Sequence, residues 1–180
     1  EKSNIQNIEC HAFINAKNIR KITLPDNVID IEGFFFSELT IPINEIMITT
    51  QSKHLIYHDD MLIQKNDGTI KLIYVNRSTI KIPFNINIIG HGAFAHSSKL
   101  KQISFESNPQ TNGFQLTEIH ESSFMNCINL KSVILPNTVR IIDRNAFFRC
   151  TSLKEVVLSD NIEIIGDFSF TQTSITSITM

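Results

Sequence analysis

Histidines are the side chains of this 180-residue sequence best suited to act as bases or metal ligands at neutral pH. His54 and His58 are four residues apart, and Asp59 and Asp60 follow them. On a helix that spacing would suit a metal ion. The context favours a strand instead, in which positions four apart lie about 13 Å from each other. We therefore expect an exposed polar edge here and no metal site.

A second group of histidines invites a general-base interpretation: His91, His96 and His120. None of them stands beside a recognisable nucleophile motif such as G-x-S-x-G. They are interpreted as ordinary turn residues. The sequence predicts a protein that is not an enzyme, with no catalytic residue, no metal and no cofactor.

The tripeptide Asn76-Arg77-Ser78 fits the N-x-S/T pattern of N-glycosylation. It follows a predicted hairpin, in a plausible surface turn. Short matches of this kind also arise by chance in an Asn-rich chain, and modification requires a secretory route. Asn76 is therefore a candidate modification site that depends on where the protein resides.

The elements that carry these residues recur along the chain. Phe124, Phe147 and Phe170 are spaced by 23 residues, and each follows a small residue. A dipeptide of Ala or Ser followed by Phe stands in five equivalent places: Ala12-Phe13, Ala93-Phe94, Ser123-Phe124, Ala146-Phe147 and Ser169-Phe170. Self-similarity with a period of 20–29 residues is typical of a leucine-rich-repeat solenoid, in which each unit is one turn of a coil.

The residue pattern of each unit predicts one strand on one side of a right-handed coil. The segment from Leu153 to Leu158 has the apolar spacing of a strand with one face in the core, and equivalent strands stack as a parallel sheet. Short turns, or helical or 3-10 segments, complete the other side, and the Phe rings form a stacked spine. Residues that tolerate a left-handed backbone follow the apolar pair of each unit, so a positive φ is expected there: Gly90, His120, Asp143 and Gly166.

Residues 46–81 depart from the repeat. Asp60 to Ile63 and Ile70 to Tyr74 flank Asn66-Asp67-Gly68, which is a strong hairpin signal. Phe36 holds a spine position in a shortened unit. We expect a single solenoid over residues 1–180, with a variant hairpin unit at about 46–81. Because solenoids need capped ends, the chain is expected to be a fragment of a longer array.

The three cysteines fit the same scheme. Cys127 and Cys150 hold equivalent places in adjacent units, roughly 5 Å apart if the coils stack. Parallel Cβ vectors disfavour a disulfide between them, so we expect two buried thiols. Cys10 is expected to be more exposed. An odd number of cysteines leaves the redox compartment open.

Composition excludes several function classes. The net charge is −2, and no run of Lys and Arg exceeds two residues, so a nucleic-acid footprint is absent. No apolar run approaches 18 residues, so no membrane insertion is expected in this segment.

Two surfaces are candidates for protein binding. The residues between the core positions of each strand face the open, concave side of the sheet: Lys21, Thr23, Gln102, Ser104, Ser132, Ile134, Glu155, Val157, Ser177 and Thr179. This face lacks Trp, Tyr and Arg, the usual hot-spot residues, so a merely soluble sheet face is the alternative. The hairpin carries both tyrosines of the chain and is the second candidate, or else a tolerated insertion: Tyr57, Lys65, Lys71, Tyr74 and Arg77.

The repeat resembles the BspA-like leucine-rich-repeat family, whose units follow I-G-x-x-A-F-x-x-C-x-x-L-x-x-I-x-L-P. The segment from Ile142 to Leu153 carries most of that pattern, Ile89 to Phe94 supplies the glycine, and Leu130 to Pro136 supplies the end. The resemblance implies an interaction solenoid, often on the surface of bacteria and anaerobic protists and associated with adhesion to matrix proteins or host cells. It implies no shared active site.

Two functions follow from this sequence. One is a non-catalytic protein-interaction module of a cell-surface or secreted adhesin that binds a host or matrix protein. The alternative is a cytoplasmic structural scaffold, for example one with a cytoskeletal partner. Buried free thiols and the absence of a visible signal peptide suit the scaffold.

Overall fold

The structure is a computed structural model that describes residues 4–13, 16, 19–34, 47–58, 61–66, 69–75 and 77–179. Within these ranges the chain forms short strands joined by turns, and no helix. The strands are β1 (Asn7–Ile8), β2 (Lys21–Leu24), β3 (Asp30–Ile31), β4 (Met47–Thr50), β5 (Leu55–His58), β6 (Met61–Asn66), β7 (Thr69–Val75), β8 (Thr79–Ile82), β9 (Ile88–Ile89), β10 (Gln102–Phe105), β11 (Glu118–Ile119), β12 (Ser132–Ile134), β13 (Ile141–Ile142), β14 (Glu155–Val157), β15 (Ile164–Ile165) and β16 (Ser177–Thr179).

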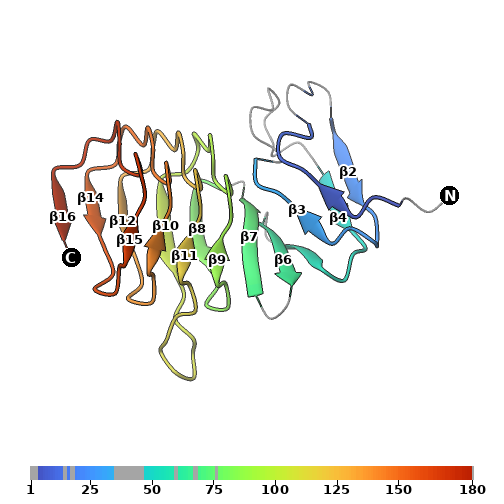
Figure 1. Cartoon of the computed structure of the whole chain (residues 1–180), viewed down its shortest axis with the longest axis horizontal. Coiled ribbons are helices and arrows are strands. Elements are labelled where there is room, and N and C mark those ends of the chain that lie inside the picture. The colour runs from blue at the N-terminus through green and yellow to red at the C-terminus, as the bar shows by residue number, and fades with distance from the viewer. Residues whose placement is uncertain are drawn as a thin grey trace.

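The predicted leucine-rich-repeat solenoid is confirmed, because each coil from β8 onward contributes one strand to each of two sides (Figure 1). On one side β8 pairs with β10, and β12, β14 and β16 form a parallel sheet. On the other side the two-residue strands β9, β11, β13 and β15 pair in parallel. Turns, and not helical segments, join the two sides within the described residues.

A stack of aromatic rings fills the centre of the coils. The ring centroids of Phe94 and Phe124 are 4.6 Å apart, those of Phe124 and Phe147 are 4.8 Å apart, and those of Phe147 and Phe170 are 5.2 Å apart. The main-chain N–H of Phe124 donates to the carbonyl of Ala146 at 2.7 Å, and equivalent bonds join the other coils. The spine prediction is confirmed, and the small residue before each Phe lies in this tightly stacked backbone.

The predicted positions of positive φ are wrong. Gly90, His120, Asp143 and Gly166 do not have a positive φ. The left-handed residues stand two places before and two places after the spine Phe: Gly92 and His96, Ser122 and Asn126, Asn145 and Arg149, Phe168 and Gln172. Both ends of each turn thereby aim their N–H groups at the next coil, as when Asn126 donates to the carbonyl of Phe148 at 2.8 Å. A close approach explains Gly166, since a Cβ there would lie 2.5 Å from the main-chain nitrogen of Arg144.

The hairpin insert is present and divides the hydrophobic core. β6 pairs antiparallel with β5 and β7, and β7 continues in parallel with β9. Consecutive residues of β6 serve opposite sides, because Met61 packs into the core of the C-terminal coils and Leu62 into the core of the N-terminal part. The insert therefore separates the two hydrophobic cores and contributes apolar side chains to each of them.

A buried glutamine side chain joins the insert to the N-terminal part. Gln64 on β6 accepts a hydrogen bond from the main-chain N–H of Ile31 at 3.2 Å and donates to a carboxylate oxygen of Asp30 at 2.6 Å. Ile31 is itself buried, so its N–H has little access to water. The amide of Gln64 thus supplies to β3 the acceptor that a further strand would otherwise provide.

Truncating the spine tests the core. Phe147→Ala should lower the free energy of unfolding by about 3–5 kcal/mol, because it removes a fully buried ring with ring contacts in both directions. Phe168→Ala is the control, since that ring is 64% exposed and its loss should change stability by about 0.5 kcal/mol or less. Urea unfolding of both variants measures the difference, and equal midpoints would contradict the spine.

Removing the glutamine amide tests the junction. Gln64→Leu should cost about 1–3 kcal/mol, because the buried N–H of Ile31 loses its acceptor. Amide hydrogen exchange should show faster exchange at Ile31, while Gln115→Leu, a change at an exposed residue, leaves it unaltered. Unchanged protection of Ile31 in the Gln64 variant would show that another group holds the junction.

Candidate protein-interaction surface

The ten residues predicted on the open side of the strands are all exposed. We call the outward side of β2, β10, β12, β14 and β16 the strand face. Register aligns the six residues on β12, β14 and β16 into rows, with Ser132, Glu155 and Ser177 side by side in one row. Buried Val133 and Val156 lie between the rows and hold the strands against the core. The exposure makes the strand face available to a partner.

The second row of the strand face is partly aliphatic. Ile134, Val157 and Thr179 are aligned by the same register. The side chain of Ile134 is 68% exposed and that of Val157 is 36% exposed, although both are apolar. Two neighbouring coils thus present apolar surface to solvent at equivalent places.

A row of lysines borders these two rows, and sequence reasoning did not single it out. Lys101, Lys131 and Lys154 each directly precede a strand, and all three are exposed. The main-chain N–H of Lys154 donates to the carbonyl of Lys131 at 2.9 Å, so these two lysines lie side by side at equivalent places in adjacent coils. We call these three residues the lysine row. Aligning the repeats by position, and not by apolar residues alone, would have revealed it.

The hairpin candidates are more dispersed. Lys65 and Arg77 are exposed, whereas Tyr57 is half-buried and packs against the N-terminal core. Lys71 and Tyr74 lie on β7, whose backbone pairs with β6, but their side chains are outside the described part of the structure. Asn76 and the acidic pair Asp59 and Asp60 are also outside the described residues.

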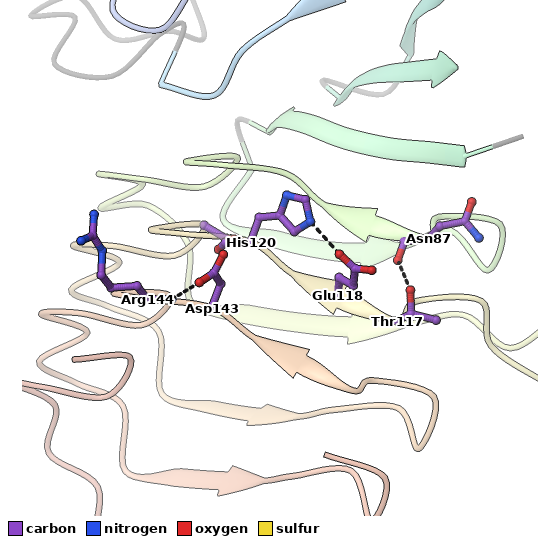
Figure 2. Close-up of polar contacts among 7 residues, drawn as sticks. Asn87, Thr117, Glu118, His120, Asp143 and Arg144 are labelled. Atoms are coloured by element: carbon purple, nitrogen blue, oxygen red, sulfur yellow. Dashed lines mark hydrogen bonds and ion pairs between the residues drawn. The ribbon is translucent and has the colours of Figure 1, made fainter. Parts of the chain in front are cut away.

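The histidines His91 and His120 on the opposite side make local contacts, and Figure 2 shows the one between His120 and Glu118. His120 Nε2 lies 2.9 Å from a carboxylate oxygen of Glu118, and its ring centroid lies 5.0 Å from that of His91. The hydroxyl of Ser123 donates to the main-chain carbonyl of His120 and not to its ring. That hydroxyl therefore makes no nucleophile–base pair with His120, which fits the turn-residue interpretation.

Cross-coil ion pairs occur on this opposite side, as one does between Lys81 and Glu106 on the side of β8 and β10. Arg144 pairs with Glu121 at 2.6 Å, one coil away, and Arg140 pairs with Glu163 at 2.6 Å. The main-chain N–H of Arg144 donates to Asp143 at 2.7 Å (Figure 2). Arg140 and Arg144 are thus each matched to a carboxylate of a neighbouring coil.

Cys127 and Cys150 are free and buried, as predicted, and Cys10 is exposed. The thiol of Cys127 lies 3.1 Å from the carbonyl of Phe94, and that of Cys150 lies 3.1 Å from the carbonyl of Phe124. Burial, together with the neighbouring Cys150, raises the pKa of the Cys127 thiol well above its ordinary value. The Cys127 thiol therefore stays protonated and unreactive at neutral pH.

Two further properties of the described residues bear on function. They include no cluster of three or more His, Cys, Asp or Glu side chains arranged to hold a metal ion. A search for a helix with the length and apolarity to cross a membrane found none among them.

Comparison with known families decides the relationship. The model of the BspA type leucine rich repeat region matches six copies over residues 2–59 and 73–180. The chain belongs to this family. Such repeats are typically non-catalytic binding modules, and leucine-rich repeats generally mediate protein binding. No curated protein matches the sequence.

Solved structures support the same fold. The pneumococcal vaccine antigen PcpA matches with a TM-score of 0.80 and 26% identity, over 98% of this chain and 42% of that one. A leucine rich cell surface protein from Faecalibacterium prausnitzii matches with a TM-score of 0.57 and 24% identity, over 97% of this chain and 51% of that one. This BspA-type chain therefore spans about half the length of these proteins, or less.

Thiol titration tests the environment of the cysteines. In the native protein at pH 8 a thiol reagent should modify Cys10 alone, and unfolding should expose all three thiols. Raising the pH to about 9, above the ordinary cysteine pKa of about 8.5, should leave the native Cys127 unmodified because its pKa is raised. Rapid modification of Cys127 by the reagent at that pH, with the fold intact, would contradict its burial.

Proposed function

We propose that this BspA-type chain is a non-catalytic protein-interaction module of a cell-surface or secreted adhesin that binds a host or matrix protein. The observation that carries the proposal is the strand face, where the coils of β12, β14 and β16 repeat exposed side chains in register with one another. The description of a matched structure as a cell surface protein supports the location, and that of PcpA as a vaccine antigen is compatible with it.

The proposed mechanism is multivalent contact along a stiff coil. The stacked Phe rings and the coil-to-coil hydrogen bonds hold the rows of the strand face at fixed spacing. Weak individual contacts then act together, because each bound site raises the effective concentration of the next. In this proposal residues 1–180 act as one binding unit, and the hairpin residues Tyr57, Lys65, Lys71, Tyr74 and Arg77 form a second contact.

One observation favours a different function, that of an intracellular scaffold with a cytoskeletal partner. Cys127 and Cys150 are reduced and sealed in the core, and free thiols are typical of reducing compartments. Burial alone also protects them outside the cell, so the thiols do not outweigh the resemblance to surface proteins. Location is therefore the property that separates the two functions.

Antibody labelling of the source cells tests the location. An antibody raised against this segment should label intact cells, because an adhesin must present its binding face outside. A cytoplasmic protein stained in parallel, which must label only after permeabilisation, controls for leaky cells. Labelling of this protein only after permeabilisation would exclude the adhesin and favour the scaffold. Surface labelling would make glycosylation of Asn76 worth testing by mass spectrometry.

A further inference from the structure

The two sides of the C-terminal coils carry different sets of charged residues, and Arg140 and Arg144 lie among carboxylates on the side of the two-residue strands. The lysine row, Lys101, Lys131 and Lys154, borders the strand face, whereas Glu118, Asp143 and Asp167 lie on or just beyond the two-residue strands of the other side. The chain as a whole has a net charge of −2. A basic strip on a slightly acidic protein marks a local preference for an anionic partner.

The lysine row has no counterion among the residues that the structure describes. None of the ion pairs found among the described residues includes Lys101, Lys131 or Lys154, in contrast to Arg140 and Arg144 on the opposite side. Like charges aligned on neighbouring strands repel each other. The carboxylates of a partner would relieve that repulsion. They could pair with these ammonium groups without breaking an ion pair within the described part of the protein.

The other two rows of the strand face indicate which class of anionic partner fits it. Ile134 and Val157 lie three residues beyond Lys131 and Lys154 on the same two coils, with Glu155 in the row between them. An aliphatic pair left exposed gains free energy when a partner covers it with apolar groups. A uniformly charged chain, such as a nucleic acid or a sulfated polysaccharide, would leave that pair uncovered and would meet the negative charge of Glu155.

We propose that the strand face over β12 and β14 binds an extended acidic polypeptide segment. Its Asp or Glu carboxylates would contact the lysine row, and its aliphatic side chains would cover Ile134 and Val157. The segment would lie across the coils, whose strands are about 4.8 Å apart, so that it contacts several rows at once. The inference rests on the proposed function only in that both require protein binding, and it does not depend on the location of the protein.

Selection from a phage library of random dodecapeptides tests the proposal directly. Selection on the purified chain should enrich peptides in which Asp or Glu accompanies Leu, Ile or Val, relative to the unselected library. The same selection on the double variant Lys131→Gln, Lys154→Gln should lose the acidic enrichment. Selected peptides without acidic residues, or no enrichment at all, would overturn the proposal.

Fluorescence anisotropy of a selected peptide then locates the site. The Lys131→Gln, Lys154→Gln variant should bind at least about tenfold more weakly than the wild type, which corresponds to about 1.4 kcal/mol. The matched control is Lys53→Gln, Arg149→Gln, which removes two exposed cationic side chains that belong neither to the strand face nor to the hairpin contact and should leave affinity unchanged. Melting curves of both variants establish that they are folded. Equal losses in the two variants would mean that net charge, and not the lysine row, drives binding.

An apolar substitution separates a peptide from other polyanions. Ile134→Ser, at an exposed position, should weaken the selected peptide severalfold while the fold is unchanged. Heparin, a sulfated polysaccharide, is the comparison ligand. Heparin binding that depends on Lys131 and Lys154 but not on Ile134, in a chain that binds no acidic peptide, would assign the face to an anionic polysaccharide and overturn the proposal. Cytoplasmic labelling in cells would refute the adhesin without affecting any of these results.

Discussion

Pairing of each coil with the next one is the constraint on which this structure depends. A single coil has strands of only two to four residues and cannot satisfy its own main-chain groups. Its N–H groups donate to carbonyls of the neighbouring coil, and Phe147 stacks on Phe124 and Phe170 at the centre. Because backbone and aromatic stacking share one axis, a unit with a changed spine residue or turn also disturbs its neighbours. This coupling explains why the spacing is so regular where the coils are continuous.

The same constraint shapes the place where the repeat is interrupted. The hairpin inserts antiparallel strands, yet the corners of the coils on either side still meet: a Cβ on Gly33 would lie 1.8 Å from the main-chain oxygen of His91. A glycine is required there because two backbones come together. Gln64 bonds to β3 along another part of the junction, and Met61 and Leu62 give each segment an apolar wall. The insert is therefore accommodated by specific contacts that replace those of a regular coil.

How much of this follows from sequence depends on the range of the interaction. The spine, the strands, the hairpin and the buried thiols were predictable, because each follows from residue type and period. The positive φ positions were not, since Arg149 and Phe168 adopt them although their side chains disfavour that conformation, and contacts with the next coil decide. The bond from Ile31 to Gln64 joins residues 33 apart without any motif. The predicted strand-face residues are exposed, but exposure does not reveal a partner.

In a repeat protein, the residue type at one position of the unit also determines the character of a whole row on the surface. A lysine at one place in a unit becomes a row when neighbouring units make the same choice, and so does an aliphatic residue such as Ile134 beside Val157. On the other side of the coils the same geometry produces ion pairs, because Arg144 and Glu121 differ in sign across one coil. On that side the signs of Arg144 and Glu121 are matched, whereas over β12 and β14 the strand face keeps like charges and apolar groups in line. The physical difference between these two surfaces is thus whether adjacent coils place opposite or like groups side by side, and the proposed partner would supply the groups that complement β12 and β14.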